Sequence, residues 1–257
     1  MKTNSSFFAK HGLKVAIIVI VLVILGFVFN HKKTPENLIK VGITAGPMQS
    51  VMAVAKKEAA KQYGLAIETV VFNDYQTPNE ALSSGDINAN IFQTIAFLND
   101  AIKQHDYKFK IIGNTFIYPM GVFSRKIHSL AALKKGAIVA IPNDPSNEDR
   151  ALRLLDTVGL IKLKAGFKGL ASLQEVIANP KHLQIKTLSA AQLPRVVPDA
   201  DIIVLNNDFV KDAGFKPSEA LAKEDPQHAK PYINVIVARA DKVDSQKIAR
   251  ISTDNAE

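Results

Sequence analysis

Apolar runs alternate with amphipathic segments along most of the chain, and this alternation predicts strands and helices in turn. In the first part of the chain, the apolar runs are bounded by Gly, Pro, Asn and Asp, which punctuate strands. The predicted strands are Leu38–Ile43, Ala66–Phe72, Ala89–Phe92 and Phe109–Phe116, with extended chain continuing over Ile117–Ser124. The helices predicted between them are Gln49–Tyr63, a short helix opened by Pro78 and closed by Gly85, and Ile95–His105.

A second series of the same kind begins at Ser129, which we expect to cap a short helix. Its strands are predicted at Ile138–Ile141, Leu183–Leu188, Asp201–Leu205 and Tyr232–Ala238. Its helical segments are predicted at Leu130–Leu133, from Asn147 to Gly159, at Leu173–Ala178, at Ala190–Arg195 and from Ser245 to Ile251. This order argues for α/β architecture with parallel sheets. Two series, with a last strand that can return to the first sheet, predict two lobes: residues 38–124 with 225–257, and residues 125–224.

The N-terminus has a different pattern. Residues 1–14 form a basic polar tail, residues 15–29 are wholly apolar, and residues 30–37 form a short linker. A helix of this apolar length spans about 22 Å, less than the hydrocarbon core of about 30 Å, although flanking lysines can extend it by snorkelling. The alternative is a cleaved signal peptide, but large residues at 27–29 stand where a cleavage site needs small ones. We favour an uncleaved membrane anchor.

Composition narrows the classes of function. The chain carries a net charge of +8 and no Cys, so it has neither a disulfide framework nor a cysteine nucleophile. Its basic residues are scattered, with no zinc-finger spacing and no RNA-recognition signature, and we therefore expect no nucleic-acid binding. A solvated basic surface facing anionic lipid fits the charge better.

The stretch Ala140–Arg150 has the pattern of a strand, a turn and a helix. We expect Asn147 to cap this helix and Arg150 to lie one turn inside it. Ligands of α/β sheets bind at the carboxyl ends of strands, and an Arg there suits a small carboxylate. The alternative is an ordinary strand-to-helix connection with a surface Arg.

Other polar and aromatic residues also follow predicted strand ends. Tyr75 follows the second strand, Phe92 ends the third, and Asn206 follows Leu205. Asn234 instead lies inside an apolar strand, where its amide must be satisfied, either by a structural bond to a neighbouring loop or by a ligand. Together with Phe97, these aromatic and amide residues would suit a site for a free amino acid with an apolar side chain. The alternative is that the aromatic residues only pack in the hydrophobic core.

An enzyme is less well supported by the sequence. None of the six His residues has metal-ligand spacing, and the chain has no G-x-S-x-G, Walker or G-x-G-x-x-G motif. We therefore expect no catalytic activity and no cofactor.

With these residues in hand, the chain resembles the methionine-binding NlpA/MetQ-type substrate-binding proteins of bacterial ABC importers. The resemblance covers Leu38 to Arg239. It rests on the blocks at residues 41–47, 72–75, 78–82, 85–93, 140–147 with Arg150, 159–164, 191–195 and 231–234.

The resemblance implies a two-lobed periplasmic-binding-protein fold of type II, with the ligand held in the cleft. It implies that Arg150 holds the ligand carboxylate with support from Asn147, and that Asn206 and Asn234 hold the amino group. Tyr75, Phe92, Thr94 and Phe97 would then line the side-chain pocket.

Three departures from the family pattern bear on the ligand and the anchor. The family usually carries His where this chain has Thr94, and Tyr where it has Phe97. Family members are typically lipidated on a Cys, which this sequence lacks, so the apolar segment is expected to replace the lipid. The family also usually extends further than Glu257, so we expect incomplete C-terminal packing.

The sequence thus predicts a binding protein that delivers L-methionine or a related amino acid to an ABC permease and ATPase. It would sit at the bacterial inner membrane through its N-terminal helix, with the rest of the chain facing the periplasm or the cell exterior. The alternative is a diverged, anchored sensing or surface interaction protein that no longer serves transport.

Overall fold

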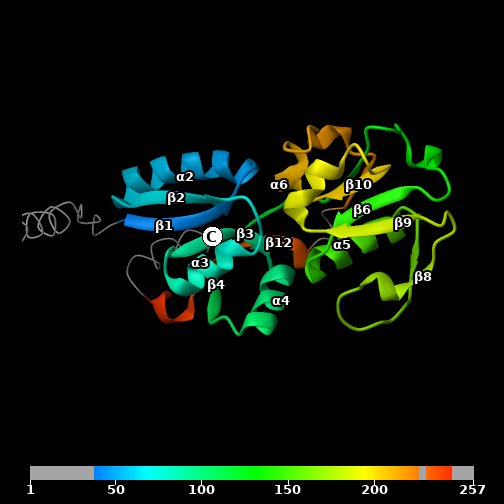
Figure 1. Ribbon diagram of the computed structural model, residues 1–257. Helices are drawn as coiled ribbons and strands as arrows, with labels where there is room; N and C mark the ends of the chain where they lie inside the picture. Colours follow the sequence, from blue (N-terminus) through cyan, green and yellow to red (C-terminus); the bar gives the residue numbers. More distant parts are fainter. Residues whose placement is uncertain (1–37, 226–229, 245–257) are drawn as a thin grey trace, which may run out of the picture. The chain divides into compact units, whose positions relative to one another are not determined.

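The computed structural model describes residues 38–225 and 230–244. The described elements from Ile39 onward belong to one compact unit of the chain. They form two five-stranded sheets, called sheet A and sheet B here, with helices packed on both faces of each (Figure 1).

Sheet A has the strand order β2-β1-β3-β12-β4. Its strands are β1 (Leu38–Thr44), β2 (Ala66–Phe72), β3 (Ala89–Thr94), β4 (Phe109–Ile117) and β12 (Ile233–Arg239). The helix α2 (Pro47–Tyr63) buries Met48 and Met52 against one face of the sheet. The helices α3 (Thr77–Ser84) and α4 (Ile95–His105) bury Leu82 and Leu98 against the other (Figure 1).

Sheet B has the order β11-β5-β10-β6-β9. Its strands are β5 (Gly121–Phe123), β6 (Ile138–Pro142), β9 (Gln184–Leu188), β10 (Ile202–Leu205) and β11 (Ala222–Lys223). One face packs on α5 (Pro145–Thr157), and the other on η3 (Ala190–Val196) and α6 (Asn207–Val210). Smaller elements are η1 (Leu130–Ala132), β7 (Lys162–Leu163), η2 (Leu173–Glu175), β8 (Val176–Ala178), η4 (Pro217–Glu219), η6 (Lys230–Tyr232) and η7 (Ala240–Lys242).

The chain passes between the sheets twice. The first crossing is Tyr118–Met120, between β4 and β5, and the second lies between β11 and β12. The last strand therefore returns to the first sheet, as the sequence predicts. Both sheets are mixed rather than parallel, because β12 runs antiparallel to β3 and β4, and β5 runs antiparallel to β10. A strand that arrives by a crossing segment enters its sheet in the reverse direction.

Two local predictions are wrong. Asn147 does not cap α5, because the side chain of Asp144 accepts the N–H of Asn147, and Pro145 takes the first helical position. The predicted helical turn Leu173–Ala178 is helical only over Leu173–Glu175 and continues as strand β8. In the predicted extended chain over Ile117–Ser124, strand β4 ends at Ile117 and strand β5 spans Gly121–Phe123, with the first crossing and Pro119 between them.

Other predictions remain open. The basic tail, the apolar segment at 15–29, the linker and the helix from Ser245 lie outside the described residues. In the ranges that are described, no helix is both long and apolar enough to cross a membrane. The lobe boundaries also stay a prediction, although β5, assigned to the first lobe, pairs within sheet B.

Candidate ligand-binding site

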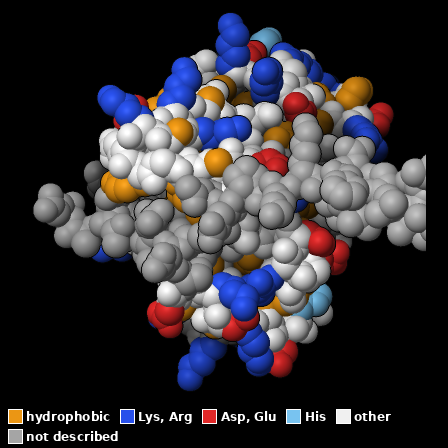
Figure 2. Space-filling view, turned by 90° about the vertical axis from the view of Figure 1, so that its left-hand side faces the viewer, with side chains coloured by type: hydrophobic (Ala, Val, Ile, Leu, Met, Phe, Trp, Pro, Cys, Tyr) orange, Lys and Arg blue, Asp and Glu red, His pale blue; other side chains and the backbone are white. Residues whose placement is uncertain are grey.

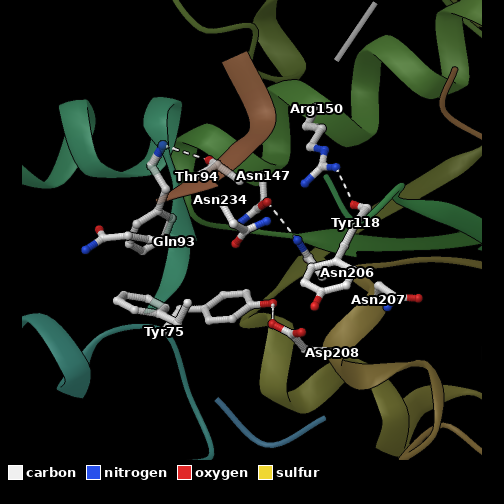
Figure 3. A pocket seen from close by; sticks show the side chains of 12 residues that line it. Tyr75, Gln93, Thr94, Tyr118, Asn147, Arg150, Asn206, Asn207, Asp208 and Asn234 are labelled. Atoms are coloured by element: carbon white, nitrogen blue, oxygen red, sulfur yellow. Dashed lines mark hydrogen bonds between the residues drawn. The ribbon is translucent and has the colours of Figure 1, made fainter. Parts of the chain in front are cut away.

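All eight sequence-predicted site residues meet around one pocket between elements of sheets A and B (Figure 3). The residues that line it are Tyr75, Phe92, Gln93, Thr94, Phe97, Tyr118, Asn147, Arg150, Asn206, Asn207, Asp208 and Asn234. They come from the end of β3 and the first turn of α4, from the turns after β2 and β10, from the first two turns of α5, from the first crossing and from the start of β12. Their proximity is a finding, whereas their contact with a ligand stays a prediction.

Arg150 lies one turn inside α5 and is 3% exposed, so it is not the surface Arg of the alternative interpretation. Its Nε and Nη2 donate to the two carboxylate oxygens of Glu224 at 2.7 and 2.6 Å. Nη2 also donates to the carbonyl of Tyr118 at 2.8 Å, and the guanidinium lies 4.5 Å from the ring centre of Tyr232. The guanidinium is therefore held in one orientation before any ligand arrives.

A short relay of side chains fixes the amides of Asn147 and Asn206. The carboxylate of Asp144 accepts from the side-chain nitrogen of Asn147 at 2.9 and 3.1 Å. The amide oxygen of Asn147 then accepts from the nitrogen of Asn206 at 2.8 Å. Among the described residues, the buried amide oxygen of Asn206 has no hydrogen-bond partner. It is an acceptor that a ligand ammonium would satisfy.

Asn234 is buried at an irregular point of β12, where the register with β3 shifts just after its pairing with Thr94. Its side-chain nitrogen donates to the carbonyl of Phe116 at 3.2 Å. The two alternatives for Asn234 are thus compatible, because the nitrogen makes a structural bond to a neighbouring segment while the residue lines the pocket.

Three aromatic rings form one wall of the pocket. The ring centres of Tyr75 and Phe92 are 5.9 Å apart, those of Tyr75 and Phe97 are 6.0 Å apart, and those of Phe92 and Phe97 are 5.7 Å apart. These spacings fit attractive aromatic packing and leave an apolar surface facing the polar groups.

Thr94 has a local structural role in addition to its place at the pocket. Its hydroxyl accepts the backbone N–H of Phe97 at 3.1 Å, so Thr94 is the N-cap of α4. The cap positions the turn that carries Phe97 into the aromatic wall.

Asp208 lines the pocket but was not predicted from the sequence. Its Oδ2 accepts from the hydroxyl of Tyr75 at 2.8 Å and from that of Thr44 at 3.0 Å, so these bonds join sheet A to α6. Gly46 permits the close approach, because a Cβ at this position would lie 3.1 Å from the carbonyl oxygen of Asp208. Burial raises the pKa of the Asp208 carboxyl, and these two bonds and Arg150 offset only part of that rise.

Four other groups at the site were also not predicted: Gln93, Tyr118, Asn207 and the Arg150 partner Glu224. Gln93 belongs to a buried amide network with Asn79 and Asn90, at distances of 2.8 to 2.9 Å. The available signal for Gln93 was its position directly after the predicted strand Ala89–Phe92. No local signal connects Glu224 to Arg150, because the two are 74 positions apart.

Within the described part of the chain, no group of three or more His, Asp or Glu residues is placed to hold a metal ion.

Comparison with known proteins adds family information. A family model described as NlpA lipoprotein matches residues 39–253. The D-methionine-binding lipoprotein MetQ of Escherichia coli (strain K12) is 46% identical over 217 residues, which cover 83% of this chain and 79% of the relative. The crystal structure of the methionine-binding protein MetQ is 45% identical with a TM-score of 0.80, covering 84% of this chain and 89% of that one. A nutrient-binding protein from Burkholderia cenocepacia bound to methionine is 45% identical with a TM-score of 0.79, covering 83% and 89%.

Proposed function

Because the chain belongs to the NlpA lipoprotein family, we propose that it is the substrate-binding component of an ABC importer and that it binds methionine or a related amino acid. Relatives with methionine-binding names, and a similar structure bound to methionine, support this proposal. The strand orders of the two sheets support a type II periplasmic-binding fold, with the ligand between the sheets.

One observation carries the proposal: a single pocket contains both a cation for the carboxylate of an amino acid and an acceptor for its ammonium group. Arg150 offers a buried cation for the carboxylate, and the unpartnered oxygen of Asn206 offers an acceptor for the ammonium. Asn234 lines the same pocket and adds an amide. The ammonium and carboxylate groups of a free amino acid would therefore be held by charge-assisted hydrogen bonds.

The aromatic wall supports an apolar or sulfur-containing side chain. Contacts between a thioether and aromatic rings are worth about 0.3–1.5 kcal/mol each, and Tyr75, Phe92 and Phe97 offer three such rings. Beside these rings, Thr94 adds one hydroxyl, which accepts the backbone N–H of Phe97 as a helix cap and can still donate its own hydrogen. L-methionine is the ligand we expect first, with other medium-sized apolar amino acids as competitors.

We also propose where the protein is located in the cell and how it delivers its ligand. The apolar segment at 15–29 would hold the protein in the inner membrane as a single-pass anchor, with the binding unit facing the periplasm or the cell exterior. Ligand would favour the closed arrangement of the two lobes, which the permease then recognises. No covalent chemistry is required of the protein.

Titration calorimetry of the full chain in detergent tests the proposal. We expect L-methionine to bind, and a scan of the remaining amino acids to show weaker binding or none. Arg150→Ala should weaken methionine binding by roughly ten- to hundredfold or more, because a hydrogen bond to a charged group contributes about 1.5–3 kcal/mol. Arg195→Ala, at an exposed site outside the pocket, is the control.

An unchanged affinity in Arg150→Ala would remove this residue from the site. A wild-type chain that binds no amino acid would contradict the transport proposal and favour the diverged interaction protein. Genes for an ABC ATPase and permease beside this gene would favour transport.

A further inference from the structure

The carboxylate of Glu224 is held as firmly as the guanidinium that it contacts. Glu224 follows β11, and its side chain is 11% exposed. Its Oε2 accepts the backbone N–H of Met120 at 2.7 Å, and its own N–H donates to the carbonyl of Met120 at 3.0 Å. Glu224 is therefore anchored to the first crossing by both its backbone and its side chain.

This anchoring determines which donors of Arg150 remain for a ligand. Nε and Nη2 both donate to Glu224, and Nη2 also donates to the carbonyl of Tyr118. Figure 3 shows the other terminal nitrogen, Nη1, directed toward the side of the pocket that Asn147 and Asn234 line. One nitrogen of the guanidinium is thus presented to the pocket, and the rest is held by protein.

We propose that Glu224 is a positioning residue for ligand recognition: it orients Arg150 so that Nη1 alone meets the ligand carboxylate. The inference rests on the proposed function and extends it. A preoriented guanidinium spares the ligand the cost of ordering a long side chain. Since Glu224 also balances the charge of Arg150, the site gains selectivity from geometry rather than from an unpaired positive charge.

The competing explanation is that the ion pair of Arg150 with Glu224 is purely structural and joins α5 to the second crossing. The two explanations differ in one measurable quantity, the ratio of affinities for L-methionine and L-methioninamide, which lacks the carboxylate. A structural defect weakens both ligands alike and leaves the ratio unchanged. Loss of positioning weakens the carboxylate ligand more and lowers the ratio.

The test measures this ratio by calorimetry on the full chain in detergent, for wild type, Glu224→Gln and Glu224→Asp. Gln places a donor where Nε or Nη2 needs an acceptor, and Asp keeps the charge but shortens the reach. We expect Glu224→Gln to lower the ratio at least tenfold, and Glu224→Asp to lower it as well. Glu219→Gln, which alters an exposed pair with Arg125, should keep the wild-type ratio.

The results separate this inference from the proposed function. A wild-type ratio in both Glu224 variants, or tighter methionine binding in Glu224→Gln, overturns the positioning role while the proposed function stands. A wild-type chain that binds neither ligand overturns both. Thermal unfolding of each variant shows whether it is folded, and Glu224→Asp decides the outcome if Glu224→Gln does not fold.

Discussion

The amide of Asn206 owes its orientation to a carboxylate that lies two side chains away. Asp144 can only accept, so Asn147 must turn its nitrogen toward it and its oxygen toward Asn206. Asn206 must then donate to Asn147, which leaves its own oxygen free for the pocket. A single partly buried carboxylate thus determines which atom of the Asn206 amide is left for the proposed ammonium site.

The orientation of the Asn206 amide gives a prediction for Asn206→Ala. The variant should bind L-methionine roughly ten- to hundredfold more weakly, since a hydrogen bond to a charged group is worth about 1.5–3 kcal/mol. It should bind 4-(methylthio)butanoate, which lacks the amino group, about as well as wild type does. Calorimetry with both ligands checks this, with the exposed Asn143→Ala as control. Equal losses for both ligands would show that Asn206 does not act on the amino group.

Asp208 gives a prediction about pH. Its pKa is raised in the folded protein by burial, so the folded state binds a proton more readily than the unfolded chain. The contribution of Asp208 to the stability of the folded state should therefore fall as pH rises from about 4 through the raised pKa of Asp208. Asp208→Asn lacks this titration, and its amide oxygen can still accept from Tyr75 and Thr44, which both use Oδ2.

Urea unfolding without ligand, measured from pH 4 to pH 7, tests this. We expect Asp208→Asn to gain stability relative to wild type as pH rises, and the exposed Asp212→Asn to show no such trend. A constant difference across the range would mean that burial does not perturb Asp208 in solution.

Site residues that follow a strand end were predicted more readily than the residues that they contact from other parts of the chain. Tyr75, Asn147, Arg150 and Asn206 each follow a recognisable strand end, so their common position could be inferred. The partners Asp208 and Glu224 contact residues 133 and 74 positions away, and their roles depend on how two sheets meet. Pattern along the chain carries no information about such pairs.

At the scale of elements, α4 shows how a site residue also stabilises the fold. Thr94 caps this helix, so Thr94→Ala should lower the free energy of unfolding by about 1 kcal/mol. Thr94→Ser, which keeps the hydroxyl, should stay close to wild type in urea unfolding. If Ala and Ser are equally stable, the bond from Phe97 contributes nothing to stability.

The sequence predicted most elements because each has its own local signal. The helix at Ile95–His105 and the strand at Ala66–Phe72 match the predicted bounds. The failures have physical causes. Asp144 outcompetes Asn147 as a cap because Pro145 fits the first helical position. Val176–Ala178 is a strand because it pairs with β7, a contact that lies outside its own sequence.

For the whole molecule, strand direction is the feature that local patterns could not supply. The alternation of strands and helices correctly indicates α/β layers, but each crossing reverses the strand that follows it. The same crossings carry Tyr118 and Glu224, which accept from Arg150, and Met120, which donates to Glu224. The topology therefore places the two segments that join the sheets next to Arg150, the cation that we propose binds the ligand.

The proposed anchor gives the last prediction. Residues 15–29 are apolar without interruption, so the full chain expressed in a bacterial host should stay in the membrane fraction through an alkaline carbonate wash. A chain lacking residues 1–33 should be released, whereas removal of residues 1–14 alone should leave it membrane-bound. Leu22→Arg should weaken retention, because an Arg at a helix centre costs roughly 3 kcal/mol on insertion. Release of the intact full chain by the wash would contradict the anchor, and a shortened product would indicate cleavage, because a processed segment leaves the mature protein smaller.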